Sequence, residues 1–152
     1  MIGAVDRTLS EAQQAILALT EKVCAGFDDA YWLEADRSGV FPHAFHKAVA
    51  DAGLLGVAMP EAYGGSGLGI AAAAVMMRAI AQSGAGMSGA SAVHMNIFGL
   101  QPVVAFGTEA QKARMLPPLI RGEEKACFAV TEPDAGLNTT EIKTKAERRG
   151  DH

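Results

Sequence analysis

The chain has 152 residues, of which 49% are hydrophobic and 20% charged, and its formal net charge is −4 at pH 7. A chain this apolar is not intrinsically disordered, and a net negative charge without a clustered basic face excludes a general nucleic-acid binder. The 29 alanines, with aromatic residues at only 6%, favour helices over strands. The two cysteines, Cys24 and Cys127, are too few for a disulfide framework or a four-cysteine zinc site, and we expect both thiols to be buried.

The first 122 residues carry the pattern of a helical domain. Apolar residues at spacings of three and four predict a first helix from residue 9 to about residue 35, started by a hydroxyl cap at Thr8. Further helices are expected over residues 41–52, 70–82, 88–106 and 109–120, with a kink at Pro102, a break at 83–86 and a cap at Thr108. Residues 54–59 are either a buried strand or a buried connector, and the glycine-rich residues 60–69 form a loop.

The pattern changes after residue 122. Residues 126–131 predict a strand, residues 132–136 a turn, and residues 140–147 a second strand. We therefore expect a helical domain over residues 1–122 and the beginning of a β domain over residues 123–152, truncated within a β hairpin. No uninterrupted apolar run reaches the roughly 18 residues of a membrane helix, and the first residues lack the order of a signal peptide, so a soluble, reducing compartment is expected.

Few side chains outside the last segment suggest chemistry. Residues 67–72 match a dinucleotide-binding glycine pattern, but no strand leads into them and no acid follows at the right distance, so a structural turn is the better interpretation. His43 and His46 predict a surface pair rather than a metal site, and no metal is expected. His94 lies among apolar residues, either as a partly buried, hydrogen-bonded ring or as part of a pocket between helices. Glu132 is a lone carboxylate, and we assign it no catalytic role.

The segment from Phe128 to Gly136 is the most informative one. The predicted strand ends at Thr131, where free main-chain groups and a hydroxyl could hydrogen-bond the edge of a flat, polar ring. The N–H groups of residues 135–137 could form an anion-binding nest.

Four stretches, taken in order, resemble the acyl-CoA dehydrogenase family. They are residues 36–42 (DRSGVFP), residues 52–68 (AGLLGVAMPEAYGGSGL), residues 106–119 (FGTEAQK and LPPL) and residues 128–136 (FAVTEPDAG). The resemblance implies an all-α, orthogonal or up-down N-terminal helical bundle, followed by the first strands of that family's middle β domain.

The resemblance also implies flavin chemistry. Members hold FAD and oxidise an acyl-CoA thioester, with a carboxylate removing the α proton and a hydride passing to flavin N5. By position in the family, the cofactor-binding residues would be Phe128, Val130, Thr131, Gly136 and Leu137. Many relatives carry serine at the last of these positions, so a hydroxyl contact is lost in this chain.

The acyl pocket would be bordered by Ala90, Ser91 and His94 on the family's fourth helix. The catalytic carboxylate of the family lies beyond His152, so we name no catalytic residue. We expect the 152-residue chain alone neither to hold FAD tightly nor to turn over.

Three alternatives remain open at the level of sequence. The same motifs would suit an acyl-CoA oxidase, a flavin monooxygenase of the same fold, or a non-catalytic helical interaction module. For the dehydrogenase, the expected partners are the acyl-CoA substrate and an electron-transfer flavoprotein, and exposed apolar faces predict a homo-oligomer. The expected location is the cytoplasm, or the mitochondrial matrix for a processed eukaryotic protein.

Overall fold

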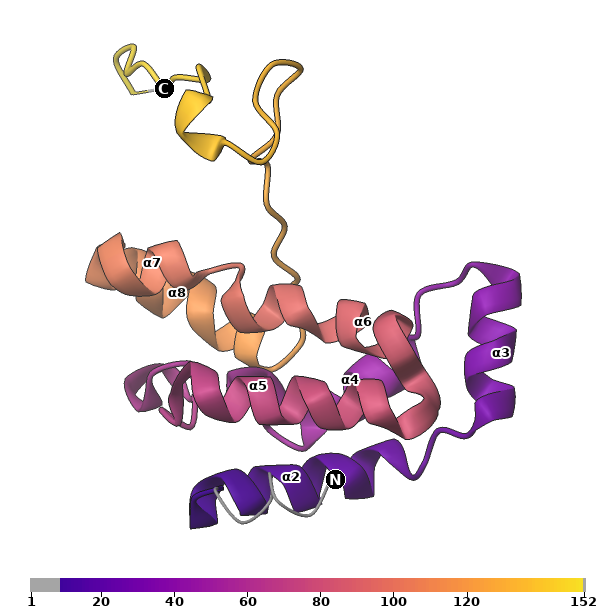
Figure 1. Ribbon diagram of the computed structural model, residues 1–152. Coiled ribbons are helices and arrows are strands. Elements are labelled where there is room, and N and C mark those ends of the chain that lie inside the picture. The colour runs from indigo at the N-terminus through magenta and orange to yellow at the C-terminus, as the bar shows by residue number, and fades with distance from the viewer. Residues whose placement is uncertain (1–8, 152) are drawn as a thin grey trace.

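The computed structural model describes residues 9–151, and helices make up the body of the molecule (Figure 1). The helices are α2 (Glu11–Cys24), α3 (Asp29–Ser38), α4 (His43–Asp51), α5 (Gly69–Ile80), α6 (Gly86–Phe98), α7 (Gln101–Phe106) and α8 (Glu109–Ile120). Short 3₁₀ turns lie at Leu54–Gly56, Glu61–Tyr63 and Thr139–Glu141. Between residues 9 and 151 there is no strand, and the one β-bridge is isolated, between Glu132 and Ala135. The all-α prediction is confirmed.

Two helices begin with reciprocal caps. Before α2, the Ser10 hydroxyl accepts from the N–H of Gln13, whose side chain accepts from the N–H of Ser10. Thr8, the cap expected from the sequence, lies outside the described residues. Thr108 and Gln111 form the same pair before α8, which confirms the predicted start of that helix.

The single first helix predicted up to residue 35 is wrong. The chain leaves the helical path after Cys24 and restarts at Asp29, because the Asp28 carboxylate accepts from the N–H of Tyr31 at 2.9 Å and so caps a new helix. Phe27, in the turn, packs its ring against Phe45 at 5.3 Å between centroids. This turn carries α3 away from the direction of α2 (Figure 1).

The helix predicted over residues 88–106, with a kink at Pro102, is instead divided into two helices. Helix α6 ends at Phe98, and α7 begins at Gln101 with Pro102 in its first turn, where a missing N–H costs nothing. The predicted break at 83–86 is confirmed: a π-helical turn spans Ala81–Ala85, Gly84 inside it has φ 93°, and Gly86 directly after it has φ 54°.

The stretch Gly69–Phe106 is long and apolar enough, by composition, to cross a membrane. It bends twice, however, and its straight parts α5 and α6 have 12 and 13 residues, against the roughly 20 that a membrane-spanning helix needs. Helices α5 and α6 contact each other and line the interior of the bundle (Figure 1). We therefore interpret this stretch as part of the protein core.

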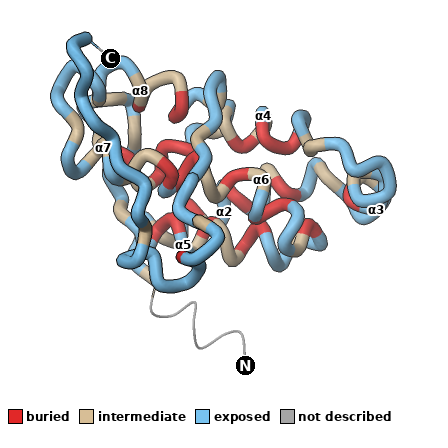
Figure 2. Tube along the Cα trace, turned by 90° about the horizontal axis from the view of Figure 1, so that it is seen from above, coloured by how far each residue is buried: buried red, intermediate tan, exposed pale blue. Residues whose placement is uncertain are grey.

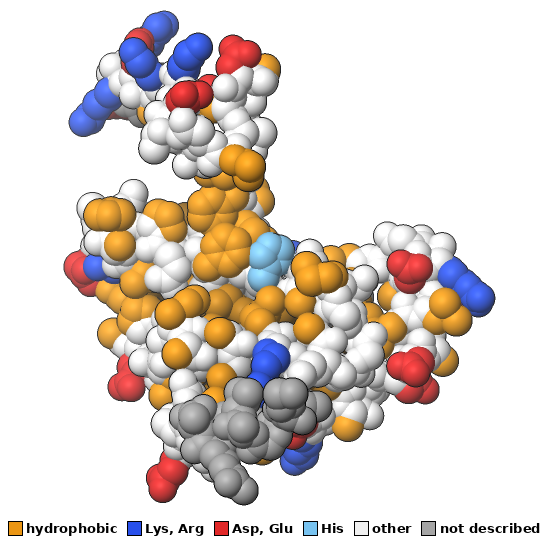
Figure 3. All heavy atoms as spheres, viewed as in Figure 1, with side chains coloured by type: hydrophobic (Ala, Val, Ile, Leu, Met, Phe, Trp, Pro, Cys, Tyr) orange, Lys and Arg blue, Asp and Glu red, His pale blue; other side chains and the backbone are white. Residues whose placement is uncertain are grey.

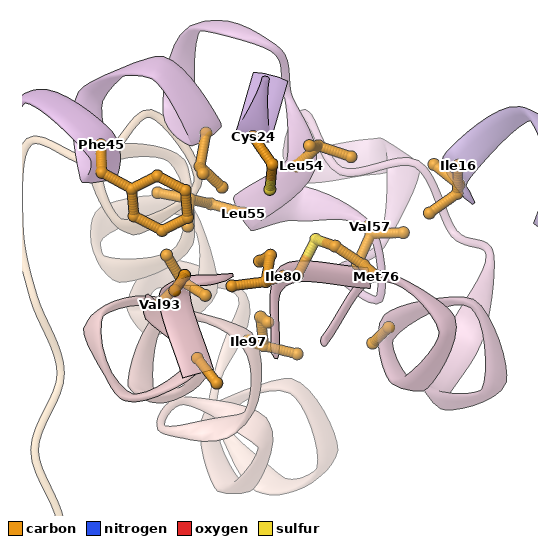
Figure 4. Close-up of a cluster of buried hydrophobic side chains, with 14 of the residues drawn as sticks. Ile16, Cys24, Phe45, Leu54, Leu55, Val57, Met76, Ile80, Val93 and Ile97 are labelled. Atoms are coloured by element: carbon orange, nitrogen blue, oxygen red, sulfur yellow. The ribbon is translucent and has the colours of Figure 1, made fainter. Parts of the chain in front are cut away.

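The core lies between α2, α4, α5 and α6. Side chains from all four helices point toward one another there (Figure 4). Its fully buried members include Phe45, Leu54, Leu55, Met76, Ile80 and Val93. Residues 54–59 are thus a buried connector rather than a strand. A second cluster, made of Met59, Leu116, Leu119 and Ile120, holds α8 on the body.

Beyond α8 the chain leaves the body as a tail, residues 123–151, most of which is exposed (Figure 2). Both predicted strands are wrong: residues 126–131 run without pairing, and residues 140–147 begin with a 3₁₀ turn and continue irregularly. A strand is stable only where a neighbour takes up its N–H and C=O groups, and residues 9–151 offer none.

Candidate functional site

Three aromatic rings form a row where the tail leaves the body. His94 and Phe98 lie one turn apart on α6, with ring centroids separated by 5.3 Å. The ring of Phe128, in the tail, lies 5.3 Å from that of Phe98. Hydrophobic side chains gather on the surface at this junction of tail and body (Figure 3). The fold thus joins one residue of the predicted acyl pocket to one residue of the predicted cofactor set.

An apolar cavity of about 170 Å³ lies beside this row, between α5 and α6. Its lining residues are Ile70, Ala73, Ala74, Met77, His94, Ile97 and Phe98. The cavity exists because α5 presents two alanines where larger side chains would fill the space. Complete small-molecule sites usually measure about 300–1,000 Å³, so this cavity can hold only part of a ligand.

His94 is the one lining residue with a polar side chain. Its Nδ1 lies 2.8 Å from the carbonyl oxygen of Ser91, and a carbonyl only accepts, so Nδ1 carries the proton. In the neutral ring Nε2 is then a free acceptor, with no partner among the described residues. The half-buried ring therefore combines both sequence interpretations: it is hydrogen-bonded, and it lines a cavity.

The other two predicted pocket residues lie elsewhere. Ala90 is buried in the core, with 6% of its surface exposed. Ser91 is exposed and lines a separate open groove of about 570 Å³ between α3 and α6. The sequence missed Phe98, although its position four residues after His94 on a helix places both rings on one face.

The tail residues of the predicted cofactor set are open to solvent. The Phe128 and Val130 side chains are 42% and 39% exposed. No described residue makes a hydrogen bond with the main chain of residues 126–131. Thr131 is exposed, a Cβ added at Gly136 would meet no atom within 4 Å, and Leu137 is fully exposed. The main-chain groups of residues 126–131 and the Thr131 hydroxyl are therefore open to solvent on this side of the tail.

Glu132 has a structural role in the tail. Its carboxylate accepts from the N–H groups of Lys143 at 2.9 Å and Thr144 at 2.7 Å, and from the Thr144 hydroxyl. These hydrogen bonds, that of Lys143 first, lower the pKa of Glu132. The carboxylate is thus held ionised by groups that close a loop of the tail.

Two further expectations need correction. His46 is not a surface residue: it lies on the inner face of α4, 4% exposed, and its Nε2 lies 3.3 Å from Oδ1 of Asn96. His43 is exposed, and residues 9–151 contain no group of three side chains suited to a metal ion.

Cys24 is buried as expected, whereas Cys127 is exposed, because the tail around it packs against little else.

Residues 10–123 match the family model described as "Acyl-CoA dehydrogenase, N-terminal domain". The chain is 37% identical to the mitochondrial isovaleryl-CoA dehydrogenase of Pongo abelii over 121 residues, which are 78% of this chain and 28% of that protein. It is 38% identical to the acryloyl-CoA reductase (NADH) of Anaerotignum propionicum over 116 residues, 74% of this chain and 28% of that one. The chain therefore spans less than a third of the length of these relatives.

The fold is likewise similar to a solved structure. Butyryl-CoA dehydrogenase from Megasphaera elsdenii matches with a TM-score of 0.74 and 27% identity, over 88% of this chain and 35% of that one. These matches confirm the family and the helical N-terminal fold that the sequence motifs indicated.

Proposed function

We propose, from the premise that this chain belongs to the acyl-CoA dehydrogenase family, that it forms the helical wall of the active site in an FAD-dependent oxidoreductase. The reaction is the α,β-dehydrogenation of an acyl-CoA thioester. The observation that carries the proposal is the position of Phe98, which contacts His94 at the cavity and Phe128 in the tail. An acyl tail in the cavity would thus lie close to a flavin flanked by residues 128–131.

In this proposal the chain binds and orients, and it supplies no base. The chemistry that FAD would supply here is acceptance of a hydride from the β carbon. The apolar lining of the cavity excludes water from the acyl tail, and the free N–H and C=O groups of residues 126–131 orient the edge of the ring system. No carboxylate lines the cavity, so the α proton must pass to a base outside its lining residues.

The cavity favours a short acyl group. Its volume of about 170 Å³ is small, and the His94 ring, anchored on the Ser91 carbonyl, closes part of it. We expect His94→Ala to shift the ratio of kcat/KM values toward longer acyl-CoAs, because removing the ring extends the cavity. His43→Ala, which removes an exposed histidine, is the control. An unchanged chain-length profile in His94→Ala would refute this role.

The overall test is acyl-CoA-dependent reduction of a dye by the protein as its source organism produces it, together with its visible flavin spectrum. Dehydrogenation should bleach the flavin with saturated substrate, and an electron-transfer flavoprotein should replace the dye as acceptor. Release of hydrogen peroxide without dye would indicate an acyl-CoA oxidase. NADH-dependent reduction of an enoyl-CoA would indicate a reductase, the activity named for the Anaerotignum propionicum relative. Absence of bound flavin from that protein would favour the non-catalytic interaction module.

Three further parts of the proposal concern the chain as a whole. Residues 123–152 begin a second, β-rich domain, in line with the unpaired main chain of residues 126–131. The 152-residue chain alone binds FAD weakly and associates with itself through exposed apolar side chains such as Phe106 and Leu137, which gel filtration would detect. The protein works in the cytoplasm, or in the mitochondrial matrix of a eukaryote.

A further inference from the structure

Asn96 is a buried polar residue at the point where three parts of the chain meet. Its side chain lies on α6 and is 2% exposed. Its Nδ2 donates to the carbonyl oxygen of Leu119 in α8 at 3.1 Å and to that of Glu124 in the tail at 3.2 Å. Its Oδ1 lies 3.3 Å from Nε2 of His46 on α4. The amide thus uses both donors and its acceptor, which is how a buried polar group becomes stabilising rather than costly.

The contacts of Asn96 also fix the state of His46. Because the two carbonyl oxygens require the amide nitrogen on their side, Oδ1 faces His46, and Nε2 of that ring must donate. The ring is packed against the end of α8, since a Cβ at Gly122 would lie 3.2 Å from its Cε1. Gly122 has φ 73°, the left-handed conformation that ends the helix at this point.

The remaining contacts hold the same short segment. The carbonyl oxygen of Pro118 accepts from the N–H groups of Glu123 at 2.9 Å and Glu124 at 3.2 Å. The Lys125 ammonium lies 4.9 Å from the centre of the Phe41 ring. Residues 119–125 are therefore anchored, whereas the main chain from residue 126 to residue 131 has no hydrogen bond among the described residues.

We propose that Asn96, oriented by His46, is a positioning residue: it sets the direction in which the chain leaves α8 and thereby places Phe128 against Phe98. Phe128 lies four residues beyond Glu124, and an extended chain of that length reaches about 14 Å at most. Anchoring the Glu124 carbonyl therefore confines Phe128 to the neighbourhood of the cavity. The consequence for flavin binding rests on the proposed function, but the placement of Phe128 does not.

The clamp formed by His46, Asn96 and the Glu124 carbonyl should depend on pH. Burial lowers the pKa of His46; the hydrogen bond with Asn96 opposes that shift, and Lys125 and His43 add to it. The pKa of His46 in the folded state lies below the unfolded value of about 6.5. Its contribution to the free energy of unfolding is therefore fully present above pH 6.5 and is lost as the pH falls through the lowered pKa. Protonation places a charge inside the clamp, beside two groups that can also be positive.

The test places a nitroxide spin label on the exposed Cys127 of the full chain, in a Cys24→Ser background, and measures its mobility by electron paramagnetic resonance. Asn96→Asp keeps the size of the side chain but removes both N–H donors. We expect a several-fold faster rotation of the label in this variant, with unchanged far-UV circular dichroism. Asn138→Asp, on an exposed tail asparagine, is the matched control and should leave the mobility unchanged.

A second variant separates positioning from general stability. His46→Gln can still donate a hydrogen bond to Asn96 but cannot titrate. At neutral pH the spin label in this variant should therefore be as immobile as in the parent chain. On acidification the label should become more mobile in the parent chain but not in His46→Gln. If Asn96→Asp does not fold, this comparison of pH responses still tests whether Asn96 and His46 position the tail. An immobile label in folded Asn96→Asp, or the same acid response in His46→Gln and the parent chain, would overturn the proposal. Loss of flavin chemistry alone, with these mobility changes intact, would instead count against the proposed function.

Discussion

Phe45 holds α3 on the helical body, so its truncation should destabilise the protein strongly. The Phe45 side chain has no exposed surface, and its ring meets those of Phe27 and Trp32 edge-on, with centroids 5.3 Å and 4.9 Å apart. Trp32 is the only buried residue of the ten in α3. Attachment of this helix therefore depends on a few aromatic contacts centred on one ring.

The size of the effect follows from burial and from these ring contacts. Replacing a buried phenylalanine by alanine costs about 3–5 kcal/mol through lost transfer energy and the cavity left behind. Phe45→Leu keeps most of the volume but loses two edge-on pairs worth about 0.5–1.5 kcal/mol each, so we expect a loss of about 1–3 kcal/mol. At about 2–4 °C per kcal/mol for a chain of this size, Phe45→Ala should lower Tm by about 6–20 °C.

The measurement is urea unfolding followed by far-UV circular dichroism and by the fluorescence of Trp32, the only tryptophan in the chain. In Phe45→Ala the emission should also shift to the red in the folded state, because Trp32 loses a covering ring. Phe106→Ala is the control, since that side chain is 89% exposed and its loss should change the stability by no more than about 0.5 kcal/mol. A loss below about 1 kcal/mol in Phe45→Ala would show that α3 is not held in this way.

The structure supports three further predictions. Gly65→Ala should destabilise the protein by about 1–3 kcal/mol in urea unfolding, because the new Cβ would lie 2.1 Å from the carbonyl oxygen of Met59. Thr108→Ala should cost about 1 kcal/mol in the same assay, since it removes the cap of α8. A thiol reagent should modify Cys127 quickly and Cys24 slowly in the native chain, because burial raises the pKa of the Cys24 thiol and shields it.

Matched controls exist for each of these predictions. Gly136→Ala adds the same methyl group where no atom lies within 4 Å and should be neutral. Thr139→Ala removes an exposed hydroxyl that makes no capping bond. In urea both thiols should react at similar rates. Equal effects of the paired alanine substitutions, or equal native reactivity of the two thiols, would contradict the packing described above.

Most of the helical body could be predicted because its signals are local. The cap at Thr108, the proline at position 102 and the glycines that break the helix near residue 84 all act through their own backbone. The prediction of one long first helix failed for a different reason. The apolar stripe continues through Phe27 and Trp32, but both rings pack against Phe45 on α4, a contact that does not require an unbroken helix between them. A stripe shows which side chains are buried, not whether the helix between them is continuous.

The site could be predicted only in part. His94 was recognisable as a polar residue within an apolar helix face, and the motif around Phe128 identified the tail. Their joint contact with Phe98 is tertiary, and no local pattern encodes it. The strand predicted at residues 126–131 has the right composition, but a strand also requires a partner, and propensity cannot supply one.

Helix α6 explains why the site and the exit of the chain are coupled. Each residue turns a helix by about 100°, so His94 and Phe98 lie within about 40° of each other, while Asn96 lies about 200° from His94. One face of α6 therefore lines the cavity, and the opposite face holds the end of α8 and the Glu124 carbonyl. The tail then passes the end of α6, where Ala126 lies against Gly99, and reaches the first face where Phe128 lies against Phe98. Any movement of α6 must consequently shift the cavity wall and the start of the tail together, so the rings of His94, Phe98 and Phe128 stay in contact.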